Sequence, residues 1–178
     1  MKSAVMGPRT QGAPDDFQTP PEALYPLLPY LKKDWTIWEC AAGKGNLVRE
    51  FEKRGYKVVA SDILTQKDFL FWRPEHFDVI VTNPPFSLKQ EFLERCYNLK
   101  KPFALLLPFT TFEGKKRQAL FKEYGVQVIF FDRRINFTTP SGTGGGAWFP
   151  VCWFCFGLEL PKEINFVEFN HPAQRKLI

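Results

Sequence analysis

The sequence has 178 residues, 44% of them hydrophobic, which suits one globular domain with a sizeable core. Its 24 Lys and Arg against 19 Asp and Glu give a formal net charge of +5, which permits a polyanionic partner without requiring one. No apolar run approaches the length of a membrane span, and residues 1–14 lack the apolar stretch of a signal peptide. We therefore expect an intracellular, cytoplasmic protein without membrane contact, with a flexible arm over residues 1–14 and a single catalytic domain over residues 15–178.

The four cysteines do not have the spacing of a metal site. Cys152 and Cys155 form a CxxC, but they lie in an apolar, strand-like run, where residues three apart point to opposite faces. The sequence holds no second CxxC and no closely spaced pair of histidines. We expect buried, free thiols and no bound metal.

The first half of the chain alternates predicted strands and helices. Apolar residues at helical spacing over Ala23–Leu31 indicate a helix, which Pro26 and Pro29 should keep short and rich in turns. The run from Trp35 to Cys40 predicts a strand, and the small residues after it predict a tight turn whose backbone can approach a ligand. The elements expected next are a helix over Asn46–Arg54 and strands over Tyr56–Ala60 and Phe77–Thr82.

The second half continues the alternation. We expect helices over Leu88–Leu99 and Gln118–Tyr124, and strands over Phe103–Pro108 and Val126–Phe131. The stretches Ile135–Phe137 and Trp148–Leu158 should pair as a hairpin at the edge of the sheet. This order predicts the α/β class, with a mostly parallel, doubly wound sheet that ends in an antiparallel hairpin.

The strand that ends at Thr82 is followed by Asn83-Pro84-Pro85-Phe86. Proline cannot donate to a sheet ladder and disfavours helix in the residue before it, so the strand must stop in a stiff turn. Ligands of open parallel sheets bind beyond the carboxyl ends of the strands. A carboxamide, a proline carbonyl and an aromatic ring at that point would suit a flat ring that carries an amino group. The alternative is a proline-rich turn in which Asn83 caps a helix and Phe86 belongs to the core.

The order of several short motifs resembles that of S-adenosylmethionine-dependent DNA adenine-N6 methyltransferases of the NPPF type, over residues 15–158. In particular it resembles the small members from phages and mobile elements, which lack a large target-recognition domain. The resemblance implies a Rossmann-like class I methyltransferase fold. The motifs that carry it are Phe17-x-Thr19-Pro20, the turn from Glu39 to Gly45, Asp62, Asp68-Phe69 and Asn83-Pro84-Pro85-Phe86.

The resemblance also implies roles toward the cofactor, S-adenosylmethionine. Glu39 and the turn residues Ala41, Gly43 and Gly45 would meet its amino acid portion, with Phe17 and Thr19 near the methionine part. Asp62 would accept hydrogen bonds from the ribose hydroxyls. Asp68 would accept one from the exocyclic amine of the cofactor adenine, and Phe69 would pack against that adenine ring.

A nicotinamide dinucleotide is a competing cofactor, because a Gly-x-Gly turn after a strand also opens dinucleotide sites. That fingerprint requires Gly or Ala three residues after Gly45, where this chain has Val48. The loop over Ser141–Gly146 lacks the Lys-Ser/Thr ending of a P-loop, so we interpret it as flexible or substrate-shaping.

For the reaction, the target base would be flipped from DNA, with Phe86 stacked on it and with Asn83 and Pro84 accepting the hydrogens of its amine. The same turn serves enzymes that methylate adenine in RNA or a glutamine amide in protein. A non-catalytic nucleic-acid-binding module of the same fold is a further alternative. Basic residues that follow two strand ends are candidate phosphate contacts. They are Lys115, Lys116, Arg117, Arg133 and Arg134.

Overall fold

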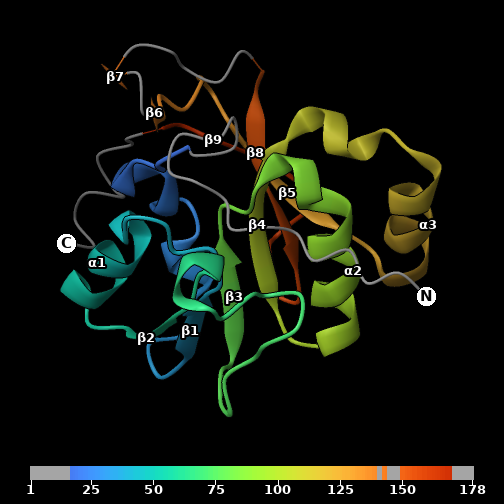
Figure 1. Ribbon diagram of the computed structural model, residues 1–178. Helices are drawn as coiled ribbons and strands as arrows, with labels where there is room; N and C mark the ends of the chain where they lie inside the picture. The colour runs from blue at the N-terminus through green and yellow to red at the C-terminus, as the bar shows by residue number, and fades with distance from the viewer. Residues whose placement is uncertain (1–16, 140–141, 144–148, 170–178) are drawn as a thin grey trace.

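The computed structural model describes residues 17–139, 142–143 and 149–169 (Figure 1). Within them, seven strands form one sheet in the order β2-β1-β3-β4-β8-β5-β9. Strand β8 runs antiparallel to both of its neighbours, β4 and β5, and the other pairs are parallel. The sheet is therefore mostly parallel with an antiparallel hairpin, as the sequence predicted, although the hairpin is formed by β5 and β8 rather than by the predicted segments. The expected arm over residues 1–14 lies outside the described residues.

The elements alternate as expected along the chain. The sheet strands are β1 (Thr36–Glu39), β2 (Lys57–Ala60), β3 (Val79–Thr82), β4 (Phe103–Pro108), β5 (Gln127–Phe131), β8 (Val151–Phe156) and β9 (Ile164–Val167). The helices are α1 (Asn46–Lys53), α2 (Lys89–Leu99) and α3 (Lys115–Tyr124). The 3-10 turns are η1 (Pro21–Leu24), η2 (Leu28–Tyr30), η3 (Ile63–Thr65), η4 (Phe86–Leu88) and η5 (Phe109–Phe112). A separate short pair joins β6 (Thr138–Thr139) to β7 (Gly142–Thr143).

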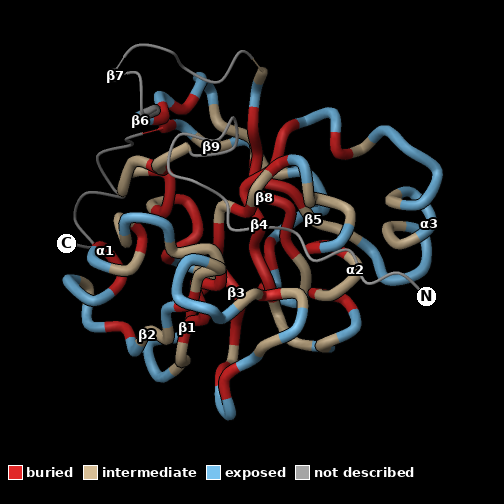
Figure 2. The backbone as a smooth tube through the Cα atoms, in the orientation of Figure 1, coloured by how far each residue is buried: buried red, intermediate tan, exposed pale blue. Residues whose placement is uncertain are grey.

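Both faces of the sheet are covered. Trp153 of β8 donates its indole N–H to the Ala23 carbonyl of η1 at 2.8 Å. The next residue, Phe154, points to the opposite face and stacks on Phe121 of α3, with ring centroids 5.9 Å apart. Helices α2 and α3 contact each other on that second face, whereas α1 contacts η1 on the first. The buried residues accordingly follow the central strands (Figure 2).

The predicted positions of the two hairpin strands were partly wrong. Ile135–Phe137 forms no strand, and β8 lies inside the sheet between β4 and β5. The reason is visible in β8 itself, since its residues from Val151 to Cys155 are all buried, as in a strand covered on both faces. The edge strand β9 was not predicted.

Several smaller expectations can be compared with the structure. The proline-rich stretch forms the turns η1 and η2, and α3 begins three residues before the predicted Gln118. All four cysteines are buried with free thiols, as expected, and burial raises the pKa of Cys152 to about 12. In the described part of the chain, no helix is long and apolar enough to cross a membrane.

The order in which successive strands are added to the sheet reverses between β1 and β3. From β1 it passes through α1 to β2 on one side, and from β3 it passes through α2 to β4 on the other. Such a switch point leaves a crevice at the carboxyl ends of the two strands, where open α/β sheets bind ligands. Glu39 ends β1 and Asn83 follows β3, so both lie at this crevice.

Candidate functional site

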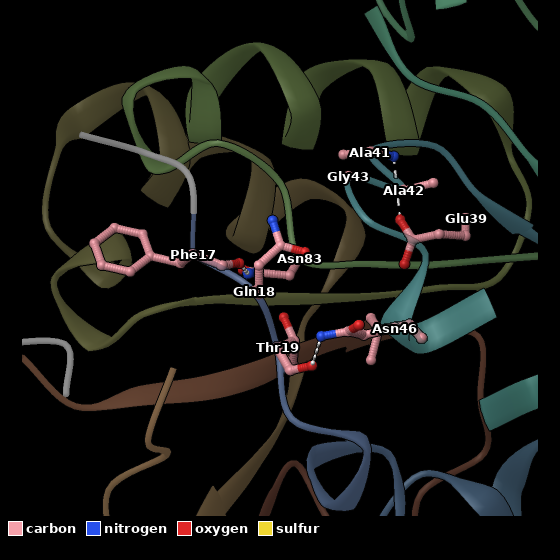
Figure 3. Close-up of a pocket in the computed structure, with 10 residues that line it drawn as sticks. Phe17, Gln18, Thr19, Glu39, Ala41, Ala42, Gly43, Asn46 and Asn83 are labelled. Carbon is pink, nitrogen blue, oxygen red and sulfur yellow. Dashed lines mark hydrogen bonds between the residues drawn. The ribbon is translucent and has the colours of Figure 1, made fainter. Parts of the chain in front are cut away.

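A pocket with about 270 Å³ of empty space, part of it open to solvent, lies at the carboxyl ends of β1 and β3 (Figure 3). It brings together predicted residues from three separate stretches of the chain. The predicted residues that line it are Phe17, Thr19, Glu39, Ala41, Gly43 and Asn83.

The turn after β1 is held open by its glycines and by Asp62. Gly43 and Gly45 both have positive φ, at +51° and +76°, which L side chains rarely adopt. The Gly43 amide donates to Asp62 Oδ2 at 2.9 Å, so the carboxylate after β2 is tied directly to the turn. The other oxygen, Oδ1, accepts from the Leu64 amide and caps η3. A Cβ at Gly43 would lie 3.2 Å from the side-chain nitrogen of Gln18, so the turn passes close beneath the Phe17–Thr19 segment.

Glu39 is a buried carboxyl that connects β1 to β3. Only 1% of it is exposed, and its Oε1 accepts from the Ala41 amide at 3.1 Å and from the Thr82 hydroxyl. Burial raises the pKa of Glu39 to about 8, and the negative charge of Asp62 adds to this, while the two hydrogen bonds oppose it. Because Thr82 directly precedes Asn83, the glycine turn after β1 and the Asn-Pro-Pro-Phe turn share this hydrogen-bonded group.

The carboxamide of Asn83 has a fixed direction. Its Nδ2 donates to the Phe17 carbonyl at 3.1 Å (Figure 3). Its Oδ1 is buried, yet no group in the described residues donates to it. A buried carbonyl oxygen without a donor is uncommon and costs free energy, so it marks a position where a ligand donor would be favoured.

Four aromatic rings surround the end of this turn. Phe17 and Phe86 stack, with centroids 5.6 Å apart and planes inclined by 25°. The edges of Phe137 and Phe149 meet Phe86, and Phe137 also meets Phe17. Phe86 is consequently only 7% exposed. Pro84 is buried as well, and Pro85 is half-buried.

The segment Phe17–Thr19 is fastened across the site. Gln18 exchanges two backbone hydrogen bonds with Thr138, at 2.9 and 3.1 Å. Its side-chain oxygen accepts from the Lys44 amide at 3.2 Å, and Asn46 Nδ2 donates to the Thr19 carbonyl at 3.4 Å. The segment therefore bridges the glycine turn and the Asn83 turn.

Sequence reasoning missed some residues that line the pocket. Gln18 occupies the variable position of the Phe-x-Thr-Pro motif, and Asn46 follows the glycine turn directly. Their positions next to predicted residues were the available signal. The residues concerned are Gln18, Ala42, Asn46 and Leu47.

The predicted contact of Phe69 with a cofactor adenine does not agree with its position. Phe69 is 2% exposed, its ring stacks on Phe92 of α2 at 4.5 Å, and Trp38 packs against it at 5.1 Å. Phe69 is thus a core residue beneath the site, because α2 covers it. Asp68 is half-buried, and its Oδ1 accepts from the Leu70 amide at 2.9 Å.

The candidate phosphate contacts differ in their surroundings. Lys115, Lys116 and Arg134 are exposed, and Arg133 is exposed beside Asp132 at 3.4 Å. Arg117 instead donates to the Thr111 carbonyl at 2.8 Å, to Gln90 Oε1 at 3.3 Å and to the Glu113 carbonyl. These bonds hold η5 and the start of α3 together, so the Arg117 guanidinium is already engaged.

Comparisons with known proteins bear on the fold. No protein-family model matches the sequence, and no curated protein matches it. The structure is similar to a modification subunit of a putative type I restriction enzyme from Vibrio vulnificus YJ016, with TM-score 0.52 and 14% identity over 90% of this chain and 48% of that one. A dimethyladenosine transferase from Plasmodium falciparum matches with TM-score 0.49 and 11% identity over 78% of this chain and 62% of that one. This chain thus spans about half the length of the first structure, and it has the Rossmann-like fold of methyltransferases.

Proposed function

We propose that this protein transfers a methyl group from S-adenosylmethionine to the exocyclic N6 amine of adenine in DNA, with the target base flipped and held by Asn83-Pro84-Pro85-Phe86. The observation that carries the proposal is the buried Oδ1 of Asn83, to which no described residue donates. An amine N–H is a donor that would satisfy this oxygen. The Phe17 carbonyl, by accepting from Nδ2, keeps the oxygen end of the carboxamide available to such an amine.

The cofactor side of the pocket has the donor set that S-adenosylmethionine needs. The cationic amino group would lie at the buried Glu39 carboxyl and would favour its ionised form. The turn over Ala41–Gly45, with Gly43 at positive φ, would offer its backbone beside it. Asp62, anchored by the Gly43 amide, retains lone pairs for ribose hydroxyls. Thr19 and Asp68 complete the proposed contacts. When bound, this cofactor would supply a methyl group from its sulfonium sulfur. The carbon–sulfur bond breaks, and its electron pair stays on sulfur. The amine nitrogen forms the new carbon–nitrogen bond and loses a proton to water.

On the acceptor side, the residues act on the geometry of the amine. The lone pair of an adenine amine is delocalised into the ring, so the nitrogen is a poor nucleophile. If Asn83 Oδ1 and the Pro84 carbonyl accept its two hydrogens, the nitrogen is drawn toward tetrahedral geometry and its lone pair becomes available. Holding the amine in this way needs no covalent intermediate with the protein, and positioning and fixed dipoles provide the acceleration.

The test is transfer of labelled methyl groups from S-adenosylmethionine to DNA, to RNA and to ribosomal proteins in separate incubations, followed by identification of the labelled nucleoside or amino acid. We expect N6-methyladenine in DNA. Label in RNA alone, or in glutamine of protein alone, would overturn the DNA assignment. Absence of transfer to all three, with cofactor binding intact, would identify a non-catalytic module.

A further inference from the structure

Phe17 lines the pocket, and its ring also makes a contact that the sequence motif did not imply. The motif associates Phe17 with the methionine part of the cofactor. The ring of Phe17 stacks on Phe86, the ring proposed to hold the target base, with centroids 5.6 Å apart. The carbonyl of Phe17 also accepts from Asn83, so both its backbone and its side chain lie on the acceptor side of the site.

The ring of Phe17 is less buried than those of Phe86 and Phe137. Phe86 is 7% exposed and is held by the edges of Phe137 and Phe149. The Phe17 side chain is half-buried, while its backbone is fixed by Asn83 and by the neighbouring Gln18–Thr138 bridge. A change in the Phe17 rotamer can therefore uncover one face of Phe86 without disturbing the hydrogen bond that orients Asn83.

The spacing of the two rings also specifies the shape of an inserted group. Stacked carbon atoms rest about 3.5–4 Å apart, so a planar ring between Phe17 and Phe86 requires about 7 Å between them. The ring centroids are now 5.6 Å apart, so the two rings must move apart to admit it. Both faces that would then meet the ligand are aromatic and nearly parallel, with a 25° inclination, which suits a flat ring.

We infer that Phe17 is the second aromatic wall of the acceptor site, and that the amine which Asn83 receives is therefore carried on a planar ring, a nucleobase, rather than on a glutamine side chain. This inference rests on the proposed methyl transfer and deepens it. Phe17 and Phe86 enclose the base from its two faces, and Asn83 accepts from the amine at its edge. A glutamine amide has no ring to fill the space between the two phenyl groups.

The test compares wild type with Phe17→Leu and Phe17→Tyr, measuring KM for adenine-containing DNA and, by calorimetry, Kd for S-adenosylmethionine. Base–aromatic stacking contributes about 1–3 kcal/mol, so Phe17→Leu should raise the acceptor KM by roughly 5-fold to 100-fold. The cofactor Kd should stay unchanged, and Phe17→Tyr, which keeps an aromatic ring, should raise the acceptor KM less than Phe17→Leu does. Since the bond to Asn83 comes from the backbone, these substitutions change the ring alone.

Phe121→Leu is the matched control, because Phe121 stacks on Phe154 with nearly the same geometry, 5.9 Å and 23°, away from the pocket. It should leave the acceptor KM unchanged. If Phe17→Leu raised the cofactor Kd and left the acceptor KM unchanged, Phe17 would contact the cofactor rather than the base, and the inference would be overturned. A lower acceptor KM would also overturn it, by showing that the ring only obstructs the site. Wild-type transfer into glutamine would overturn both this inference and the proposed function.

Discussion

Glu39 joins the two halves of the site through a single carboxyl. It accepts from the Ala41 amide in the glycine turn after β1 and from the Thr82 hydroxyl at the end of β3. In a fully buried position the charged form is penalised, which is why the pKa of Glu39 rises to about 8 despite these two bonds. The same group therefore affects both the site and the pH dependence of stability.

The sign of that dependence follows from proton binding. Between about pH 4.5 and pH 8 the unfolded chain has released the Glu39 proton, whereas the folded protein still holds it. The free energy of unfolding of wild type should fall as the pH rises across this range. Glu39→Gln cannot ionise, yet its side-chain oxygen can accept the same two hydrogen bonds. Chemical denaturation at a series of pH values should give a flatter profile for Glu39→Gln, and an equally steep decline in both proteins would contradict the assignment.

For the turn at Asn83, the sequence predicted the position of the side chain but not its orientation. The prolines alone predicted that β3 ends in a stiff turn with Asn83 at the carboxyl edge, and this is observed. The direction of its carboxamide was not predictable, because it is fixed by the Phe17 carbonyl, 66 residues earlier in the chain. The burial of Phe69 was not predictable for a similar reason, since it depends on packing against Phe92 of α2.

Among the elements, β8 departs most from expectation. Its alternation of sides sends Trp153 toward η1 and Phe154 toward α3, so it holds together the two helical layers. The apolar run was recognised as a strand, but its insertion between β4 and β5 depends on tertiary pairing that local patterns do not encode.

Trp153→Phe tests the role of β8 in joining the layers. The indole N–H donates to the Ala23 carbonyl at a buried position, and its loss leaves that carbonyl without the bond. We expect a loss of roughly 1–3 kcal/mol in the free energy of unfolding, measured by chemical denaturation. Trp35→Phe, at a half-buried position before β1, is the control and should cost less. Equal losses in the two variants would contradict this role.

At the scale of the whole molecule, the parallel strands direct their carboxyl ends, and the segments that follow them, to one edge of the sheet (Figure 1). The α/β alternation predicted this arrangement, because a strand–helix–strand sequence leaves little freedom in strand direction. Lys115 and Lys116 begin α3 after β4 has ended and are exposed, and we propose them as phosphate contacts.

A charge-matched pair of variants tests this interface. Lys115→Gln/Lys116→Gln should weaken DNA binding regardless of sequence and lower the slope of log K against log salt by about 2, since two phosphate contacts are lost. Lys100→Gln/Lys101→Gln removes the same charge just before β4 begins, at the opposite edge of the sheet. Fluorescence anisotropy of labelled DNA at several salt concentrations would measure the binding constant of each pair of variants, and we expect the larger loss for Lys115→Gln/Lys116→Gln. Equal weakening by both pairs would indicate an effect of net charge alone.

The central claim is that the Asn83 carboxamide receives an adenine amine of DNA. The most direct measurement is the N6-methyladenine content of DNA incubated with S-adenosylmethionine and either wild type or Asn83→Ala, with Asn98→Ala, an exposed position on α2, as control. We predict N6-methyladenine with wild type and Asn98→Ala, and at least about 100-fold less with Asn83→Ala, whose cofactor Kd stays near the wild-type value. Wild-type levels of N6-methyladenine with Asn83→Ala would contradict the account.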